Sequence, residues 1–429
     1  MRARMLSIRE VSMGVFDGPH ATPELHDSGA AVFLGIPNIR PDGSLDLAAA
    51  RWVAEKDLPR WNRRVTPQAH DIVFTYEATL NRYALIPEGL NCTLGRRTAL
   101  IRPNPKVVDH RYLYYYFYSA PWRAQIDANT LTGATVDRIP LTTFPDFKVV
   151  VPDLKAQGAI AEILATYDNL IATNQRRITL LEQAVRLLYR EWFVQLRFPG
   201  HELVSVRDGL PEGWRRATLG EMCDEVPGAC VQTGPFGSQL HQYDYRPEGV
   251  PVVMPQDIVG DRIRQDRIAF VDEATAARLD RHSLQPLDIV FPRRGDIAKR
   301  ALVEEHQAGF LCGTGCLKIS LPLAPLHPLL LYFQLADPAT VKWIEGQAVG
   351  ATMLNLSATI LKSVSCLVPT VDAQARFVEI ASDIRQQIDF IERAVAETAR
   401  ARDLLLPRLM SSQLDVSRTP LLDGDTVTA

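Results

Sequence analysis

The residues best suited to chemistry are four cations in the stretch PRRGDIAKR. Arg293 and Arg294 follow a predicted strand directly, and Lys299 and Arg300 close the same short segment. An arginine side chain can contact a phosphate, or it can make a bidentate contact to guanine in the major groove. The alternative is a charged loop that faces solvent. We interpret this stretch as a candidate DNA contact.

Other predicted loops contain small or basic residues that could also contact DNA. A loop of small residues lets backbone N–H groups and a hydroxyl approach a phosphate closely, although a plain turn has the same composition. Two Gly-Ala-Thr triplets fit this description, each before a predicted strand. The candidates are Gly133 and Thr135 in the first triplet, Gly350 and Thr352 in the second, and the cations Arg82, Arg96 and Arg97.

Motifs for covalent catalysis are absent from the sequence. It contains no phosphate-binding G-x-x-x-x-G-K-[ST] loop, no G-x-S-x-G and no H-E-x-x-H. The stretch 119–122 approaches the catalytic motif of amino-methyltransferases but lacks its first proline. Asp153 and Glu162 could form a nuclease carboxylate pair, but Leu164 stands where a lysine is needed, and Asp153 is better explained as a helix cap. We expect no covalent chemistry, no cofactor and no metal in this chain.

Length and composition limit the possible classes of protein. A chain of 429 residues exceeds one ordinary core, so two domains are expected. With 47 basic and 50 acidic residues, any nucleic-acid surface must be local. The apolar stretch 319–336 contains three prolines, which predict a strand, a turn and a helix start instead of a membrane span. Only Cys312 and Cys316 lie close together, without zinc-site spacing, as expected for reduced thiols in a cytoplasmic protein.

Two long helices with heptad patterns are the elements that must position these candidates. Apolar residues recur at alternating steps of four and three, which predicts a coiled coil. Each residue of the second seam follows its counterpart by 217 residues (377 − 160). The first seam contains Ile160, Leu164, Tyr167, Ile171, Asn174, Ile178, Leu181, Val185, Leu188 and Trp192, and the second contains Phe377, Ala381, Ile384, Ile388, Ile391, Val395, Thr398, Arg402, Leu405 and Leu409.

Some seam residues leave their roles open. Asn174 either fixes the register of the helices from a core position or faces solvent at a break in the seam. Thr398 and Arg402 weaken the second seam. Trp192 and Phe193 close the first helix and pack either on a partner subunit or on the second domain.

The offset of 217 residues recurs upstream of the helices and predicts a tandem duplication. Each half contains a globular part with predicted strands, followed by a long helix. The matching pairs are Asp71–Phe74 with Asp288–Phe291, Gly133–Thr135 with Gly350–Thr352, Val151-Pro152 with Val368-Pro369, and Gln157 with Gln374.

These patterns predict an α+β protein with two similar α/β recognition domains. Antiparallel pairing of the helices would relate the halves by a pseudo-twofold axis. The aromatic run 112–117 is interpreted mostly as core within a helix. The predicted parts are domain 1 at 1–152, the first helix at 153–196, a linker at 197–216, domain 2 at 217–369, the second helix at 370–414 and a disordered tail at 415–429.

The arrangement resembles the specificity subunit of type I restriction-modification systems along essentially the whole chain. The features that carry this resemblance are FDGPHATPELHDSGAAVFLGIPNI, LPEGWRRATLGEMCDEV, GPFGSQL and the closing DAQARFVEI…ARDLLLPRLM. A Val-Pro pair and a glutamine also introduce each helix, as in that family. Through the resemblance, Gly237 and Ser238 of GPFGSQL join the candidate DNA contacts.

The resemblance implies that each globular domain reads one half of an interrupted DNA sequence. It also implies that the two helices hold two modification subunits, which carry the methyltransferase chemistry and bind S-adenosylmethionine. Restriction subunits join that core in systems that cleave DNA, and the sequence leaves open whether one exists here. The alternative function is a coiled-coil tether without sequence-specific DNA binding.

Overall fold

The computed structural model describes residues 3–48, 50–133, 136–348, 354–411, 413–414 and 416. The chain forms two compact units. Unit 1 comprises residues 1–176 and 391–429, and unit 2 comprises residues 177–390. Two long helices, α5 (Leu154–Tyr189) and α11 (Val371–Met410), contribute to both units. The mixture of sheets and long helices confirms the predicted α+β class.

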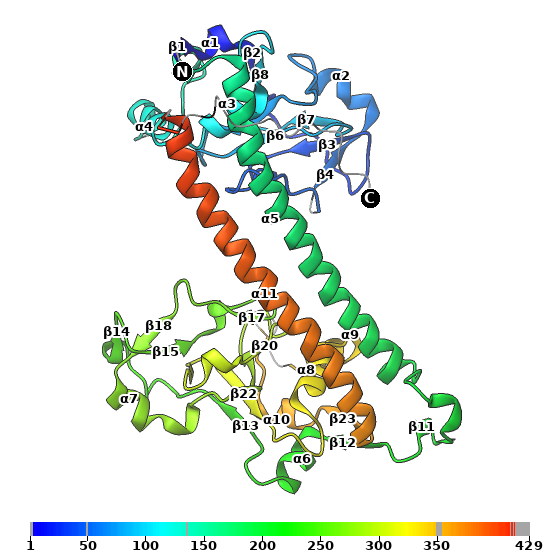
Figure 1. Cartoon of the computed structure of the whole chain (residues 1–429). Helices are drawn as coiled ribbons and strands as arrows, with labels where there is room; N and C mark the ends of the chain where they lie inside the picture. Colours follow the sequence, from blue (N-terminus) through cyan, green and yellow to red (C-terminus); the bar gives the residue numbers. More distant parts are fainter. Residues whose placement is uncertain are drawn as a thin grey trace. The chain divides into compact units, whose positions relative to one another are not determined.

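Unit 1 contains two small sheets and a separate strand pair (Figure 1). In the second sheet β3 and β7 run parallel, and all other pairings are antiparallel. The first sheet has the order β2 (Ser12–Asp17), β8 (Thr98–Pro103), β5 (Ile72–Thr75), β6 (Tyr83–Leu85); the second has the order β4 (Arg51–Val53), β3 (Ala31–Leu34), β7 (Cys92–Leu94); and β1 (Arg4–Ser7) pairs with β9 (Lys148–Val151).

Short helices complete unit 1, and the aromatic run 112–117 lies in its core. The prediction for this run is confirmed, because all of its side chains are buried and its rings contact one another and Trp122. Burial of these large rings provides much of the apolar area that stabilises the unit. The helices are α1 (Ile8–Val11), α2 (Leu58–Trp61), α3 (His110–Tyr116) and α4 (Ala120–Asn129).

Unit 2 also contains two small sheets and a strand pair that includes the last strand before α11. The parallel pair here is β15–β21. The first sheet has the order β13 (Cys230–Thr233), β22 (Cys316–Ser320), β19 (Ile289–Pro292), β20 (Ala301–Leu302); the second has the order β14 (Tyr245–Arg246), β18 (Ala269–Val271), β15 (Val250–Val253), β21 (Leu311–Cys312); and β12 (Arg215–Thr218) pairs with β23 (Ser365–Val368).

Two hairpins and five helices complete unit 2. The apolar stretch 319–336 forms the end of β22, a connection and the helix α8, so the prediction of a strand, a turn and a helix start is confirmed. The hairpins are β10 (Val206–Arg207) with β11 (Leu210–Pro211) and β16 (Ile258–Val259) with β17 (Arg262–Ile263), and the helices are α6 (Leu219–Glu225), α7 (Glu273–Arg278), α8 (Pro328–Ala336), α9 (Pro338–Gln347) and α10 (Ala358–Lys362).

The heptad residues of α5 and α11 face the interior of their units. Every predicted seam residue is buried or half-buried. Asn174 is only 8% exposed, so it occupies the interior and does not mark a solvent-facing break. Trp192 and Phe193 lie in a π-helical turn after α5 and pack within unit 2, against Phe377 of α11 and, for Phe193, against Trp214. The second of the two alternatives for this aromatic pair is therefore correct.

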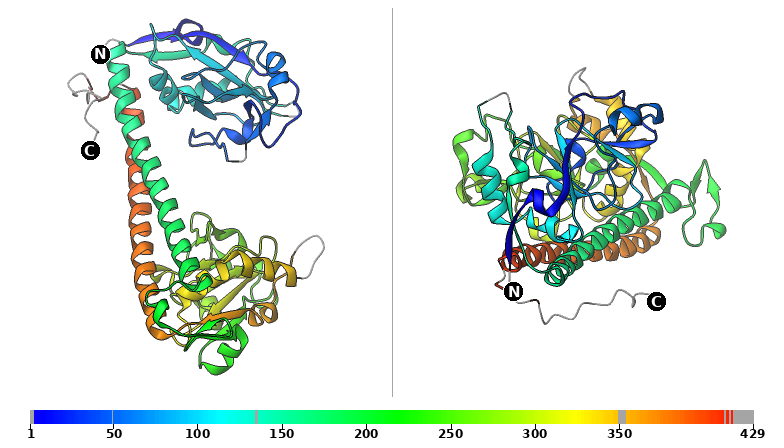
Figure 2. Two further views of the ribbon diagram at one scale, coloured as in Figure 1. Left: turned by 90° about the vertical axis from the view of Figure 1, so that its right-hand side faces the viewer. Right: turned by 90° about the horizontal axis from the view of Figure 1, so that it is seen from above.

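A buried glutamine fixes the start of α5 to the globular part of unit 1. The side-chain carbonyl of Gln157 accepts a hydrogen bond from the backbone N–H of Asp109 at 2.7 Å. Its amide donates to the carbonyl oxygens of Pro152 at 2.8 Å and Val107 at 3.2 Å. Figure 2 shows β1, which pairs with the strand just before this helix, beside the first turns of α5. The backbone at the start of α3 and the chain entering α5 are thus joined by one side chain.

Gln374 makes the same three contacts at the start of α11 in unit 2. Its carbonyl accepts from the backbone N–H of His327 at 2.9 Å, and its amide donates to the carbonyl oxygens of Pro325 and Pro369, both at 2.9 Å. Both glutamines are buried. A buried amide is tolerated only when its hydrogen-bonding groups are satisfied, and these are.

Replacing Gln157 by Ala should therefore lower the free energy of unfolding of unit 1 by about 2–4 kcal/mol, because three buried backbone groups lose their partner. The measurement is the thermal unfolding midpoint, together with amide hydrogen exchange at Asp109. Gln386→Ala, on the exposed side of α11, is the matched control. It should change neither the unfolding midpoint nor the hydrogen exchange at Asp109. Equal effects of the two substitutions would contradict the role given to Gln157.

Candidate nucleic-acid interface

Arg293 lies at the end of β19, where backbone hydrogen bonds fix it on both sides. Its N–H donates to the carbonyl of Gly315 at 2.7 Å, and its carbonyl accepts from the N–H of Leu356 at 2.8 Å. The next residue, Arg294, forms an isolated β-bridge with Asn355. The side chains of both arginines therefore project from a backbone that is held rigidly against two neighbouring loops.

The segment 234–240 is a third loop in this group. The Arg293 guanidinium lies over the ring of Phe236, 5.5 Å from its centroid, and that ring is 55% exposed. The Thr314 hydroxyl donates to the carbonyl of Pro235 at 3.0 Å. At Gly234 a Cβ atom would lie 2.0 Å from the carbonyl oxygen of Gly313, so only glycine allows this close approach. The glycine that opens GPFGSQL thus places Phe236 beside Arg293.

The surface of these loops presents donors and an aromatic face to solvent. Arg294, Gly237 and Ser238 are exposed. Lys299 is exposed and forms an ion pair with Asp296 at 3.6 Å. Guanidinium groups can bind phosphates or guanine edges, and an exposed ring can stack on a base. This arrangement suits nucleic acid and contains no group that would start a covalent reaction. We refer to residues 234–240, 293–299 and 354–356 as the Arg293 loop cluster.

Two features of the cluster were not evident from the sequence. Phe236 was missed, although it stands inside the quoted GPFGSQL motif and an aromatic residue between glycines is a usable signal. The Nε of Arg293 and the Oδ1 of Asn355 are buried, with no hydrogen-bond partner among the described residues.

Arg300 was predicted to contact DNA, and the structure corrects this prediction. It is only 6% exposed, and its guanidinium lies 5.5 Å from the ring centroid of Tyr332. The same group donates to the carbonyl of Ala298 at 2.7 Å and lies 3.9 Å from the carboxylate of Asp261. A side chain with these partners stabilises the interior of unit 2 and cannot reach a DNA backbone.

In unit 1, Tyr76 has the backbone hydrogen bonds that Arg293 has in unit 2. Its N–H donates to the carbonyl of Arg97 at 3.3 Å, and its carbonyl accepts from the N–H of Ile139 at 2.8 Å. The side chain differs, because Tyr76 is buried. Burial, with smaller contributions from Asp17 and Glu77, raises the pKa of Tyr76 to about 12, so the hydroxyl stays protonated at neutral pH.

The cations predicted in unit 1 have different environments. Arg96 is exposed, and the Nε of Arg97 donates to Glu77 at 3.1 Å. Arg82 is half-buried and donates to the carbonyl oxygens of Ile36 and Ile39, at 3.4 and 3.2 Å. Arg82 therefore supports a loop, and these hydrogen bonds disfavour its predicted contact with DNA.

The glycine-containing triplets fall mostly beyond what the structure describes. Gly133 is exposed with a φ of 100°, and no atom would lie within 4 Å of an added Cβ. Thr135, Gly350 and Thr352 lie outside the described residues. Their predicted contacts with phosphate stay predictions.

The described residues contain no group of three or more His, Cys, Asp or Glu side chains that could hold a metal ion. Within the same residues, no helix is long and apolar enough to span a membrane.

Comparison with known proteins finds relatives of the chain. Residues 21–183 match the family described as the type I restriction modification DNA specificity domain. The MjaIX specificity subunit of Methanocaldococcus jannaschii is 21% identical over 370 residues, which cover 85% of this chain and 82% of that protein. The MjaVIII specificity subunit of the same organism is 18% identical over 369 residues, covering 85% and 84%.

A solved structure supports the fold of this chain. The type I restriction-modification S subunit from M. genitalium superposes with a TM-score of 0.57 at 15% sequence identity, covering 95% of this chain and 96% of that one. Such a likeness shows that the two proteins share an architecture.

The Arg293 loop cluster predicts a contrast between two arginines of this chain. Arg294→Ala should weaken binding to duplex DNA by about 1–3 kcal/mol if the side chain contacts a base edge, with the unfolding midpoint unchanged. Arg300→Ala should instead lower the free energy of unfolding by about 2–4 kcal/mol, because it leaves buried partners unpaired.

Fluorescence anisotropy at one fixed salt concentration measures the binding, since phosphate contacts depend strongly on salt. Thermal unfolding of each variant measures the stability. Unchanged binding after Arg294→Ala would leave that residue as part of a solvated loop. Uniform weakening over all sequences would identify Arg294 as a phosphate contact.

Proposed function

We propose that the chain is the DNA sequence-recognition subunit of a type I restriction-modification complex and reads an interrupted target. The globular part of each unit reads one half of the target. The helices α5 and α11 form an antiparallel coiled coil that carries two modification subunits. Those subunits bind S-adenosylmethionine and transfer the methyl group, and restriction subunits join where the system also cleaves.

The observation that carries this proposal is the Arg293 loop cluster in a chain whose residues 21–183 match a DNA specificity domain. A rigid backbone that presents arginines and an exposed ring is suited to reading base edges. A tether that only joins two proteins would not need such a surface, which disfavours the alternative function.

A tandem duplication is supported by the like construction of the two units. The strands β5 and β19, whose first residues are 217 apart in sequence (289 − 72), are both third in the order of a four-stranded sheet. Gln157 and Gln374 make equivalent hydrogen bonds at the start of their helices. Two like domains on one chain suit two half-sites on one DNA molecule.

Antiparallel pairing of the helices is supported by contacts inside each unit. In unit 2, Tyr189 at the end of α5 contacts Phe377 near the start of α11. In unit 1, Asp168 of α5 pairs with Arg402 near the end of α11, at 2.7 Å. These contacts agree with the heptad spacing, and a buried Asn174 suits a residue that fixes the register of a coiled coil.

Co-purification and genome methylation test the function together. The chain expressed with its modification subunits should form a complex that methylates one interrupted motif in the genome. The isolated chain with S-adenosylmethionine should transfer no methyl group, because it carries no motif for that chemistry. A chain that binds no modification subunit would overturn the proposal, and methylation by the homogeneous chain would overturn the division of labour.

The length of the helices should set the gap between the two half-sites. A seven-residue insertion in each helix, near Asn174 and near Ile391, keeps the heptad and lengthens the coil by about 10 Å. This is about three base pairs of DNA, so the methylated motif should gain that spacing while its half-site sequences stay the same.

A four-residue insertion at the same two places is the comparison, since it disturbs the heptad and should cost stability. The motif is read from the methylated genome of cells that carry each variant. An unchanged gap in a seven-residue variant that still methylates would show that the helices hold subunits without measuring DNA.

A further inference from the structure

Unit 1 contains an open cleft of about 440 Å³ between a turn of the globular part and the two long helices. The turn belongs to the segment 39–45, whose ends form a β-bridge. Asp42 lines the cleft from this turn, and Tyr114 and Tyr118 line it from α3 and the residues just after it. Asp168 of α5 and Asp403 of α11 line it as well. The cleft thus combines carboxylates with aromatic rings.

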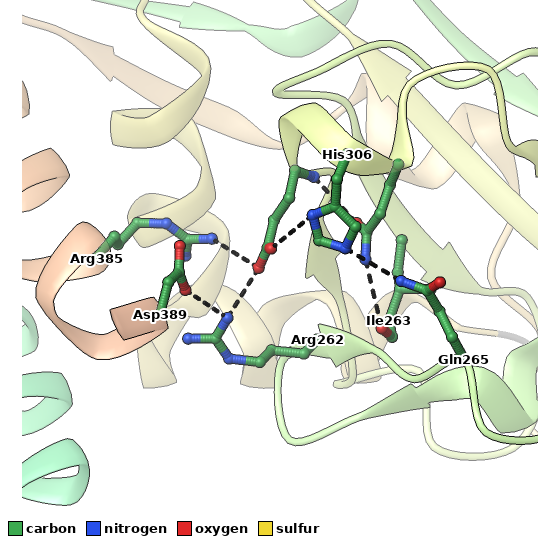
Figure 3. Close-up of polar contacts among 8 residues, drawn as sticks. Arg262, Ile263, Gln265, His306, Arg385 and Asp389 are labelled. Carbon is green, nitrogen blue, oxygen red and sulfur yellow. Dashed lines mark hydrogen bonds and ion pairs between the residues drawn. The ribbon is translucent and has the colours of Figure 1, made fainter. Parts of the chain in front are cut away.

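The corresponding place in unit 2 is closed by the unit's own arginines. A cavity of only about 40 Å³ is left beside the hairpin β16–β17. Asp261 in this hairpin lies 3.4 Å from the guanidinium of Arg186 on α5. Arg262 pairs with Asp389 of α11 at 3.0 Å and with Glu304 at 2.8 Å, and Figure 3 shows this network with Arg385 beside it. Opposite charges therefore hold the hairpin against the helices.

The charge on the helix is reversed in unit 1. Arg186 and Asp403 occupy equivalent places, 217 residues apart (403 − 186). Unit 2 has an aspartate in its hairpin and an arginine on the helix, whereas unit 1 has Asp42 in its turn and a second aspartate on the helix. Two carboxylates that line one cleft favour a cation between them.

The cations of unit 1 that line this cleft already have partners. Arg402 donates to Asp168 at 2.7 Å and to Asp403 at 2.8 Å. Arg123 lies over the ring of Tyr118, 6.0 Å from its centroid. Neither arginine fills the cleft of unit 1, whereas the arginines of unit 2 fill most of the corresponding space there.

The aromatic wall shows which kind of cation fits. In unit 2 the guanidinium groups of Arg300 and Arg385 lie over the ring of Tyr332, at 5.5 and 5.8 Å from its centroid. Unit 1 has tyrosines at this place. Burial raises the pKa of Tyr114 and of Tyr118 well above the usual value, and the carboxylate of Asp42 adds to the rise. The lining carboxylates Asp42, Asp168 and Asp403 outnumber the lining arginines Arg123 and Arg402, and the tyrosine rings are neutral, which suits a planar guanidinium.

We propose that this cleft binds an arginine side chain of a partner protein, whose guanidinium lies between Asp42 and Asp403 and stacks on the tyrosines. A guanidinium from another chain would complete in unit 1 the contact that Arg186 and Arg385 make internally in unit 2. That the partner is a modification subunit rests on the proposed function, whereas the chemistry of the cleft belongs to this chain alone.

The site is tested on the purified full chain with the peptide acetyl-Gly-Arg-Gly-amide, by isothermal titration. The matched probe replaces arginine by citrulline, which has nearly the same shape without the charge. The arginine peptide should bind and the citrulline peptide should not. Asp42→Asn and Asp403→Asn should each weaken binding about tenfold, because each removes a charged hydrogen-bond acceptor. Asp127→Asn, at an exposed position on α4, is the control and should leave binding unchanged.

Asp403→Arg gives unit 1 the charge arrangement of unit 2. It should abolish peptide binding and raise the unfolding midpoint, because its guanidinium can pair with Asp42 inside the cleft. Equal binding of the two peptides, or arginine binding that both Asn variants retain, would overturn the site. If the Asp403→Arg variant unfolds at a lower temperature than the unchanged chain and still binds the arginine peptide, the comparison with unit 2 is overturned.

Two further experiments distinguish a protein arginine from a small polyamine as the source of the cation. A photo-crosslinking residue at Ala120, which lines the cleft, should label a modification subunit in the purified complex. Spermidine should bind less tightly than the arginine peptide. Tighter binding of spermidine, or a complex that forms without a crosslink from this position, would overturn a protein arginine as the occupant. A chain that binds the peptide but no modification subunit would overturn the proposed function and leave the site standing.

Discussion

The structure depends on a buried amide at the start of each long helix. Gln157 and Gln374 each satisfy one backbone N–H and two carbonyl oxygens that would otherwise be buried without partners. A rotation of the helix relative to the globular part of its unit would break all three bonds at once, at a cost of several kcal/mol. The helix direction is therefore fixed by the chain segments that carry these backbone groups.

The two units hold their helix pair by different interactions. Unit 2 uses an aromatic cluster around Phe377, whereas unit 1 uses a polar chain from Tyr115 through Asp168 to Arg402. Arg402 was expected to weaken the heptad seam. Burial disfavours its charge, but the hydrogen bonds that it donates to Asp168 and Asp403 outweigh that effect and raise its pKa. A charge on a helix seam is thus satisfied when the two long helices themselves supply carboxylate partners.

Periodic features of the sequence predicted the fold well, because burial of apolar side chains imposes them. The strands around Ile72 and Ile289, the seam residues and the aromatic helix 112–117 were all identified in this way. The candidate site was predicted less completely. A run of cations in a sequence does not show which side chain points inward. Arg300 comes directly before β20, whose two residues are buried, and its side chain is buried with them. Short strands such as β16 and β17 have no periodic pattern.

The match between Tyr76 and Arg293 shows how one backbone arrangement can carry two different side chains. Both residues use the same backbone hydrogen bonds to a neighbouring loop and to the segment before the last strand. Their side chains are unrelated, and so are their surroundings, with a buried phenol in one unit and an arginine over an exposed ring in the other. Because the backbone contacts do not depend on the side chain, substitutions here change the presented chemistry without disturbing the frame. Two like units can therefore differ at this position while their buried glutamines make the same hydrogen bonds.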